Sequence, residues 1–232
     1  MSSLDGKIAL ITGAKGALGS FVTDAFLAAG ARVVGVSRSI KASDFSHPEF
    51  SAMPAELNSG EAARKVADDV VAQFGRIDAL VHVMGGYAGG KSVAETDDAM
   101  FEQMLDLNYR AGFYITRAVL PRMREQGSGR ILAVASRQAV EPGAMVAAYS
   151  ASKAALVALI RAIALENKDR CISANTVLPA TLDTAANRSG IANADTSQWV
   201  QPSQVAATLV HLASDQGAQI TGAAIPIFGK QI

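Results

Sequence analysis

The chain has 232 residues, of which 50% are hydrophobic and 18% are charged, and its 21 lysines and arginines balance its 21 aspartates and glutamates. This apolar content over this length is enough for one sizeable core and argues against intrinsic disorder. The zero net charge lacks the basic excess typical of nucleic-acid-binding proteins, so we expect no nucleic-acid partner.

Membrane association is not expected either. A spanning helix needs about 20 mostly apolar residues, whereas the most apolar helical stretch, 154–165, is interrupted by Arg161 and flanked by Lys153 and Glu166. The N-terminus has no long apolar core of the kind that a secretory signal carries. Cys171 is the only cysteine, and its apolar neighbourhood favours a buried structural thiol. We therefore expect a soluble, cytoplasmic protein.

Short apolar segments alternate with longer amphipathic ones, which is typical of βαβ units and a parallel sheet. Strands are predicted, in chain order, at 8–11, 32–36, a short segment ending near 56–57, 78–83, 130–135, 172–178 and 222–228. Helices are predicted at 19–29, 61–74, 97–107, 110–124, 149–167 and 202–213. Residues 184–201 show no clear periodicity. No linker or repeat divides this order, so the pattern predicts one α/β domain over residues 1–232.

Glycines cluster between the first predicted strand and the first predicted helix, in the run Thr12-Gly13-Ala14-Lys15-Gly16-Ala17-Leu18-Gly19. Such glycines permit a tight turn and a close approach of the backbone to a pyrophosphate, which the helix N-terminus stabilises. An ordinary strand-to-helix turn is the alternative. The position directly after the first strand favours dinucleotide binding, although the spacing T-G-x-x-x-G-x-G differs from the commonest fingerprint, G-x-G-x-x-G.

The residue that ends the second strand distinguishes the two nicotinamide cofactors. An acid there binds the adenosine ribose of NAD and repels the 2′-phosphate of NADP. This chain has Ser37 and Arg38 at that place, and Lys15 lies in the glycine loop. A hydroxyl and two cations suit a phosphate dianion, although each cation alone is equally compatible with a solvated surface residue. Together they predict NADP(H) in preference to NAD(H).

A group of polar residues points to proton transfer. Tyr149 and Lys153 lie four residues apart and share one face of a predicted helix. A nearby ammonium lowers the pKa of a phenol from about 10, which allows proton exchange with a carbonyl or an alcohol. Ser136 closes the fifth predicted strand, at the sheet edge where ligands bind, and its hydroxyl can hold a substrate oxygen. The alternatives are a surface Tyr–Lys contact and, for Asn108, a satisfied polar residue of the core.

These residues together resemble the short-chain dehydrogenases/reductases in their single-domain branch, and the resemblance covers essentially the whole chain. The residues that match the family's cofactor loop are Thr12, Gly13, Gly16 and Gly19. The residues that match its catalytic tetrad, in order, are Asn108, Ser136, Tyr149 and Lys153. The resemblance implies a Rossmann-type doubly wound parallel sheet of about seven strands, with helices on both faces.

The resemblance also implies roles. Hydride passes between the nicotinamide and a carbonyl-type carbon, with Tyr149 as acid and base and Ser136 polarising the oxygen. Lys153 lowers the pKa of Tyr149 and binds the nicotinamide ribose, and Asn108 connects Lys153 to a proton relay through a bent helix and a water. The cofactor contacts implied or predicted beyond the matched glycines are Lys15, Ala17, Leu18, Ser37, Arg38, Glu56, Leu57, Gly85, Tyr149, Lys153, Pro179, Leu182 and Thr184. We assign no metal ligand.

Two segments carry a more specific resemblance. Residues 83–90, and residues 177–184 with parts of 187–199, resemble dihydropteridine reductases. Animal members of that group carry an acid after the second strand and lack the Asn and Ser of the tetrad. We therefore interpret the chain as a bacterial-type carbonyl reductase with a similar pocket frame and infer no pterin substrate. Tyr87 and Trp199 are predicted to line the pocket and stack on a flat ring, or Trp199 packs its loop onto the body.

Two further side chains have structural alternatives. Arg137, beside Ser136, is a candidate contact for an anionic substrate, with a solvated arginine as the favoured interpretation. His82 stands in the segment His82-Val83-Met84-Gly85, where the family usually has Asn-Asn-Ala-Gly, and is interpreted as a packed core histidine.

The function predicted is an NADP(H)-dependent oxidoreductase acting on a small carbonyl, alcohol or pterin-like ring. One alternative is a 3-oxoacyl-thioester reductase, whose acyl-carrier partner would require a basic patch. The candidates for that patch are Arg110, Arg117, Arg122 and Arg124. Their helix is otherwise expected to build the interface of a homodimer or homotetramer. The other alternative, a non-catalytic NADP(H) sensor, conflicts with the presence of both Tyr149 and Lys153.

Overall fold

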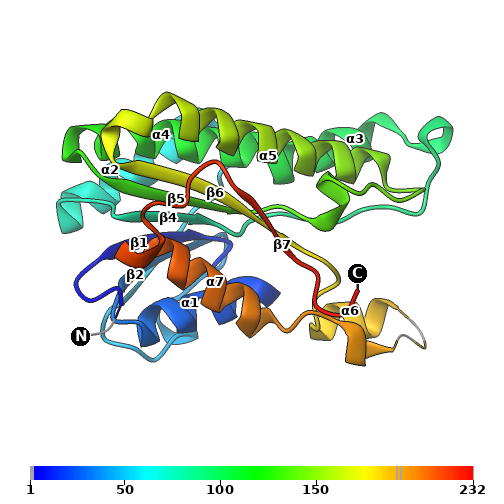
Figure 1. The fold of residues 1–232 in the computed structure, drawn as a ribbon, viewed down its shortest axis with the longest axis horizontal. Helices are drawn as coiled ribbons and strands as arrows, with labels where there is room; N and C mark the ends of the chain where they lie inside the picture. The colour runs from blue at the N-terminus through cyan, green and yellow to red at the C-terminus, as the bar shows by residue number, and fades with distance from the viewer. Residues whose placement is uncertain (1–2, 192, 194, 232) are drawn as a thin grey trace.

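The computed structural model describes residues 3–191, 193 and 195–231 (Figure 1). Within them, one sheet has the all-parallel strand order β3-β2-β1-β4-β5-β6-β7. Its strands are β1 (Ile8–Thr12), β2 (Arg32–Ser37), β3 (Phe50–Pro54), β4 (Ala79–His82), β5 (Gly129–Val134), β6 (Ile172–Pro179) and β7 (Ala224–Ile227). The helices are α1 (Ala17–Ala28), α2 (Gly60–Phe74), α3 (Asp98–Leu105), α4 (Ala111–Gln126), α5 (Ala147–Glu166), α6 (Ala185–Gly190) and α7 (Pro202–Ala213).

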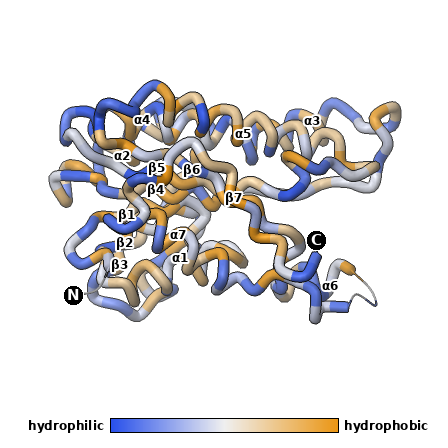
Figure 2. Tube along the Cα trace, in the orientation of Figure 1, coloured by the Kyte–Doolittle hydropathy of each residue, from blue (hydrophilic) through white to orange (hydrophobic). Residues whose placement is uncertain are grey.

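Helices cover both faces of the sheet, with α2, α4 and α5 on one side and α1 and α7 on the other (Figure 1). A strand buried on both faces needs apolar residues in succession, and all five residues of β1 are buried. Ile11 packs in the α1/α7 core with Phe26, whereas its neighbour Leu10 packs in the opposite core with Ile160. Figure 2 shows the hydrophobic colouring of the central strands β4 and β5. The predicted doubly wound fold is confirmed.

The strand order reverses direction at β1, which lies between β2 and β4. Thr12, at the carboxyl end of β1, is level with Val36 of β2 and His82 of β4. Ligands of open parallel sheets bind in the crevice outside such a reversal point. The glycine loop, the glycine cluster 85–90 and Ser136 all follow the carboxyl ends of strands and therefore meet at this edge.

Two local predictions are wrong. The third strand ends at Pro54 rather than near 56–57, because Leu57 is buried in the core beneath α2 instead of continuing the sheet. Cys171 is exposed rather than buried. It adopts a left-handed conformation with φ of 53° in the turn before β6, so its side chain points away from the core that its apolar neighbour Ile172 enters.

The predicted helices 97–107 and 110–124 form one bent helix. A π-helical turn, Asp106–Arg110, joins α3 to α4 and contains Asn108. Such a turn holds one residue more than an α-helical turn and is frequent at functional sites. Helix α6 lies in the segment 184–201, where no periodicity was evident. Helix α5 begins at 147, two residues before Tyr149.

Helix α5 is long and apolar enough to span a membrane by length and composition. In the fold, however, α5 packs on β6, its residues Leu156 and Ile160 are buried in the core, and Lys153 lies inside the protein. These contacts make α5 a core helix of the α/β domain.

Candidate active site

Ser136 and Tyr149 meet at the carboxyl end of β5. Ser136 is buried, and its Oγ accepts a hydrogen bond from the backbone N–H of Gln138 at 3.2 Å. Tyr149 lies in the first turn of α5. Burial raises the pKa of Tyr149 above its ordinary value of about 10, and a hydrogen bond with Ser136 partly opposes that rise. In this arrangement Tyr149 is therefore a neutral phenol and a proton donor.

Lys153 lies one turn further along α5 and is almost fully buried. Its Nζ donates to the backbone carbonyl of Val134 at 2.9 Å. Burial lowers the pKa of Lys153 to about 8, because a charged ammonium is poorly solvated there. The resemblance implies that Lys153 lowers the pKa of Tyr149. In this arrangement burial instead raises that pKa, and the hydrogen bond with Ser136 opposes the rise.

Asn108 is fully buried and makes three hydrogen bonds of 2.9–3.1 Å. Its amide exchanges two bonds with the backbone of Gly86 and donates a third to Ser152 of α5. A side chain at Gly85 would begin 2.8 Å from Asn108 Oδ1 and 3.0 Å from Lys153 Nζ. The glycine cluster, the π-helical turn and the lysine therefore converge on one point. The water that would complete a relay from Lys153 stays a prediction.

The glycine loop has the form that a pyrophosphate requires. Gly13 has φ of 70°, and a Cβ there would lie 2.7 Å from the backbone N of Met84, so the loops after β1 and β4 touch. Gly16 is the N-cap residue of α1 and supplies no side-chain cap. The first amides of the helix, in the turn 17–19, are therefore left for an anionic ligand.

Thr12 holds two strand ends together inside the fold. It is fully buried, and its hydroxyl hydrogen-bonds to His82 Nδ1 at 2.8 Å, which ties the end of β1 to the end of β4. Burial lowers the pKa of His82 to about 3, so the ring is neutral. The interpretation of His82 as a packed core histidine is confirmed.

At the end of β2, the hydroxyl of Ser37 accepts from the backbone N–H of Lys15 at 3.2 Å. Lys15 Nζ forms a 2.9 Å ion pair with Asp44 and also donates to the carbonyl of Ser39. Arg38 is exposed and has no ion-pair partner among the described residues. One of the two cations predicted to meet a 2′-phosphate is therefore paired with an acid that sequence reasoning missed, because the intervening residues 38–43 gave no sign of the turn.

Tyr87 stands at the mouth of the site. Its side chain is 68% exposed, and its ring lies edge-on to that of Tyr149, with 5.0 Å between centroids and 74° between planes. Exposed hydrophobic side chains also occur on the neighbouring segments, at Val140 and Met145. Gly90 N–H donates to the carbonyl of Met145 at 2.8 Å, which joins the glycine cluster to the segment before α5.

With this geometry in place, the comparison with known proteins is specific. A family model described as short chain dehydrogenase matches residues 7–195. The chain belongs to the short-chain dehydrogenase family. It is therefore a dehydrogenase or reductase, and nicotinamide cofactors are general to the family.

Relatives of this dehydrogenase differ widely in their named reactions. The asnovolin H dehydrogenase of Aspergillus novofumigatus is 31% identical, with 98% of this chain and 97% of that protein covered. The acetoacetyl-CoA reductase of an Acinetobacter strain is 28% identical, with 96% of each covered. The structure of 3-ketoacyl-(acyl-carrier-protein) reductase from Brucella melitensis, complexed with NADH, is 26% identical and superposes with a TM-score of 0.88 over 99% of this chain and 100% of that chain. These comparisons leave the substrate of the dehydrogenase open.

The remaining candidate cofactor residues of the dehydrogenase fall into two groups. Glu56 is exposed whereas Leu57 is buried in the core, so only the former is free to meet solvent or ligand. Pro179 ends β6, and Leu182 bridges to Val200. Thr184 caps α6, accepting from the backbone of Asn187 at 3.3 Å. This last group lies where the substrate loop leaves the sheet.

Asp183 is a residue of the dehydrogenase that sequence reasoning missed. Its side chain is only 11% exposed and forms a bidentate ion pair with Arg188, and it also accepts from Gln201 at 3.0 Å. The pair with Arg188 lowers the pKa of Asp183. These contacts close the base of the loop 184–201. The loop's other predicted residue, Trp199, is half-buried at its end, and its contact with substrate stays a prediction.

Arg137 of the dehydrogenase is partly exposed and engaged by three partners. Its Nε pairs with Glu141 at 2.6 Å, its Nη1 donates to the backbone carbonyl of Gln231, and its guanidinium lies 4.8 Å from the centre of the Phe228 ring. The favoured interpretation of a solvated arginine is therefore only partly right. The contact with Gln231 could not be predicted, because that residue lies 94 residues along the chain.

The arginines expected to form a basic patch are also engaged. Arg110 pairs with Glu102 and Asp106, and Arg122 pairs with Asp68. Arg124 hydrogen-bonds to Asn167, and Arg117 stacks on Phe113 and Tyr114. Their positive charge is therefore largely balanced within the chain.

Proposed function

We propose that this enzyme uses NADP(H) to interconvert a small carbonyl compound, or a pterin-like ring, and its reduced form. The observation that carries the proposal is the convergence of Ser136, Tyr149 and Lys153 beside the glycine loop. Nucleotide binding is supported by the backbone contact at Gly13 and by the uncapped start of α1. When bound there, the nicotinamide supplies or accepts the hydride.

The chain's own residues transfer the proton to the substrate oxygen. The Oγ of Ser136 accepts from Gln138, and its hydroxyl hydrogen lies beside Tyr149. When substrate is bound, that hydrogen would donate to the substrate oxygen. Tyr149, held neutral by burial, donates the proton to that oxygen in the reductive direction. Lys153, with a pKa of about 8, is mostly charged at neutral pH and stabilises the phenolate left behind. Asn108 fixes the Gly86 backbone beside these groups, and in the proposal it links Lys153 to solvent through a bound water.

Selection of NADP(H) rests on Arg38 and Ser37 at the end of β2. Arg38 is exposed without an ion-pair partner among the described residues, and no acid occupies position 37. Lys15 contributes less than its charge suggests, because Asp44 is already paired with it. We expect a moderate preference for NADPH.

The shape of the mouth favours a compact or flat substrate. Tyr87 presents an exposed aromatic edge beside the phenol of Tyr149, which offers a ring a stacking surface. A 3-oxoacyl-thioester is the second candidate, since two of the relatives named above reduce compounds of that class by name. The internal pairing of Arg110 and Arg122 weighs against an acyl-carrier partner.

An NADPH-oxidation screen tests the proposal, with quinonoid dihydropterin, simple ketones, quinones and 3-oxoacyl thioesters as substrates. We expect turnover of the ring or ketone compounds to exceed turnover of the thioesters. The reverse order supports the thioester candidate. Tight NADPH binding with no oxidation of any substrate identifies a non-catalytic sensor and overturns the proposal.

We also propose that the enzyme is a cytoplasmic homodimer or homotetramer. The α4 helix carries half-buried aromatic side chains, Phe113 and Tyr114, that suit a subunit interface. Light scattering after size-exclusion chromatography distinguishes these assemblies from a monomer.

A further inference from the structure

The C-terminal turn, defined as residues 228–231, follows β7 and lies beside α6 (Figure 1). Gln231 N–H donates to the carbonyl of Phe228 at 3.0 Å, and Gly229 supplies the left-handed conformation that the turn needs, with φ of 61°. The turn therefore has a defined form, and it contacts two segments that border the active site.

The first contact fixes the base of the substrate loop. The side-chain amide of Gln231 pairs with both backbone groups of Thr181: Nε2 donates to the carbonyl at 3.1 Å, and Oε1 accepts from the N–H at 3.3 Å. The Thr181 carbonyl also accepts from Val200 N–H at 2.9 Å, where the loop returns. Gln231 thus replaces a neighbouring strand at the point where the loop begins and ends.

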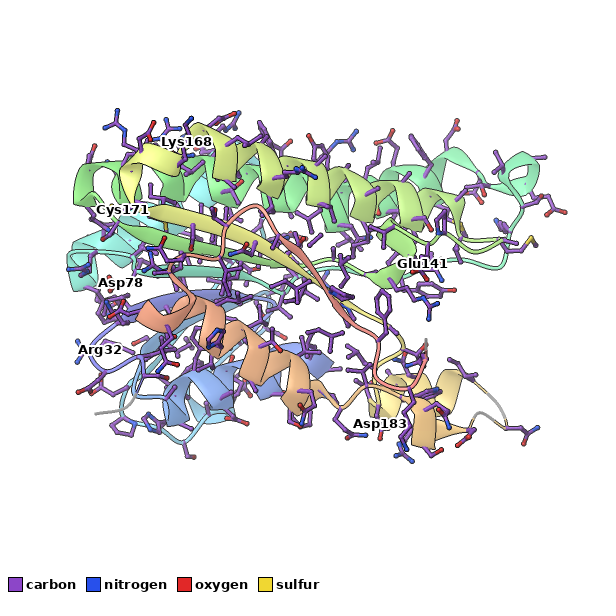
Figure 3. All side chains as sticks on the ribbon, viewed as in Figure 1. Arg32, Asp78, Glu141, Lys168, Cys171 and Asp183 are labelled. Carbon is purple, nitrogen blue, oxygen red and sulfur yellow. The ribbon has the colours of Figure 1, made fainter. Side chains whose placement is uncertain are left out.

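The second contact fixes the segment that carries the catalytic serine. Arg137 directly follows Ser136, and its guanidinium donates to the Gln231 carbonyl while stacking on the Phe228 ring. Its other side pairs with Glu141. Figure 3 shows Glu141 and Asp183, which mark the serine segment and the loop base, on opposite sides of the C-terminal segment.

We propose that the C-terminal turn is a positioning element for the reaction. Through Arg137 it holds the segment of Ser136, and through the Gln231 side chain it holds the loop that covers the substrate. The two residues divide these tasks, because the Arg137 bond uses the backbone of Gln231 and survives replacement of its side chain. The inference rests on the proposed function for its kinetic consequences.

Two variants separate the tasks. Gln231→Ala releases the loop base, so we expect KM for the carbonyl substrate to rise about 5- to 10-fold with kcat within about twofold of wild type. Arg137→Ala releases the serine segment, so kcat falls about 5- to 10-fold with a smaller change in KM. Gln231→Glu keeps the acceptor for Thr181 N–H but loses the donor. We therefore expect its KM to lie between those of wild type and Gln231→Ala.

Gln219→Ala is the matched control, since Gln219 is an exposed glutamine in the turn before β7 and has no role in the proposed site. Its kinetics and its Tm stay at wild-type values, and the Tm of Gln231→Ala falls by no more than a few degrees. Unchanged kcat and KM in both test variants of an active wild-type enzyme overturn the inference. A fall in kcat and a rise in KM that both grow with the fall in Tm also overturn the inference, because such changes indicate a general structural role.

A measurement made without substrate distinguishes failure of this inference from failure of the proposed function. Trypsin cleavage after the exposed Arg188 reports opening of the loop. We expect faster cleavage in Gln231→Ala than in wild type or Gln219→Ala, even if no carbonyl compound is turned over. Equal cleavage rates in the three proteins overturn the link between the turn and the loop, whereas failure of every substrate overturns only the proposed function.

Discussion

The proposed site has two ends: a catalytic end, formed by Asn108, Ser136, Tyr149 and Lys153, and an end proposed to bind the adenosine of the cofactor, formed by Lys15, Ser37, Arg38 and Asp44, which we call the adenosine end. At the catalytic end, Asn108 and Lys153 are almost fully buried and bonded to backbone groups of other elements. At the adenosine end, Lys15 and Arg38 lie at the surface, and only the charge of Lys15 is balanced by a surface ion pair, with Asp44.

The two ends therefore differ in how strongly a single substitution is expected to change the site. A desolvated group changes its pKa strongly, as Lys153 does, and its removal has large effects. Exposed ion pairs are worth about 0–1 kcal/mol, so the adenosine end is suited to adjusting cofactor preference in small steps. The four substitutions below test this contrast from its strongest to its weakest consequence.

Tyr149→Phe removes the proton donor from the catalytic end. We expect turnover to fall about 1,000-fold, within the range for losing a positioned general acid, while Kd for NADPH stays within about twofold. Steady-state kinetics and fluorescence titration measure the two quantities. Tyr114→Phe is the control, since that phenol lies on α4 away from the site. Retention of a tenth of the wild-type turnover would contradict the assigned mechanism.

Lys153→Met exchanges a buried charge for an apolar chain. The pKa of Lys153 is about 8 in the fold against about 10.5 when unfolded, so burying the ammonium costs about 3 kcal/mol at pH 7. This cost is fully present below pH 8 and disappears as the pH rises towards 10.5. After the lost bond to Val134, we expect the variant to be about 2 kcal/mol more stable at pH 7 and to lose this advantage by pH 10.5.

Urea unfolding at several pH values measures that stability, and turnover falls at least about 100-fold in the same variant. A variant less stable than wild type at pH 7 would show that the lysine is compensated in the fold, and would remove the main contrast between the two ends.

Arg38→Ala tests the cation of the adenosine end that has no ion-pair partner among the described residues. We expect Kd for NADPH to rise about fivefold and Kd for NADH to stay unchanged, because only the former carries the 2′-phosphate. Arg161→Ala removes an exposed positive charge from α5 and serves as the control. An equal rise in both dissociation constants would assign Arg38 to the shared part of the cofactor.

Asp44→Asn releases Lys15 from its ion pair, and the expected effect is the smallest of the four. The Kd for NADPH falls about two- to threefold and the Kd for NADH does not change. The gain shrinks at high salt, which titrations at two ionic strengths detect. Weaker NADPH binding would instead mean that Asp44 holds Lys15 in the orientation that the phosphate requires.

The catalytic end could be predicted from the sequence because its geometry follows from regular elements. Tyr149 and Lys153 share a helix face, and Ser136 follows a strand that is apolar on both faces. The order of strands and helices likewise follows from alternating apolar segments. Local rules were sufficient wherever the determining residues are near one another in the chain.

The errors occur where contacts cross a turn or join distant segments. Asp44 reaches Lys15 through the irregular connection after β2, and Gln231 reaches Arg137 and Thr181 from the end of the chain. Cys171 has apolar neighbours but stands in a left-handed turn, a backbone state that composition does not reveal. In each case the side chain's environment depends on the path of the backbone rather than on neighbouring residue types.

The π-helical turn 106–110 also limits which insertions and deletions this chain can accept. An α-helical residue occupies about 100° of rotation, so the extra residue offsets α3 against α4 by that amount. Deleting one residue from the turn would restore a regular helix and rotate Asn108 away from Gly86 and Ser152. The length of this segment is therefore as constrained as the identity of its asparagine.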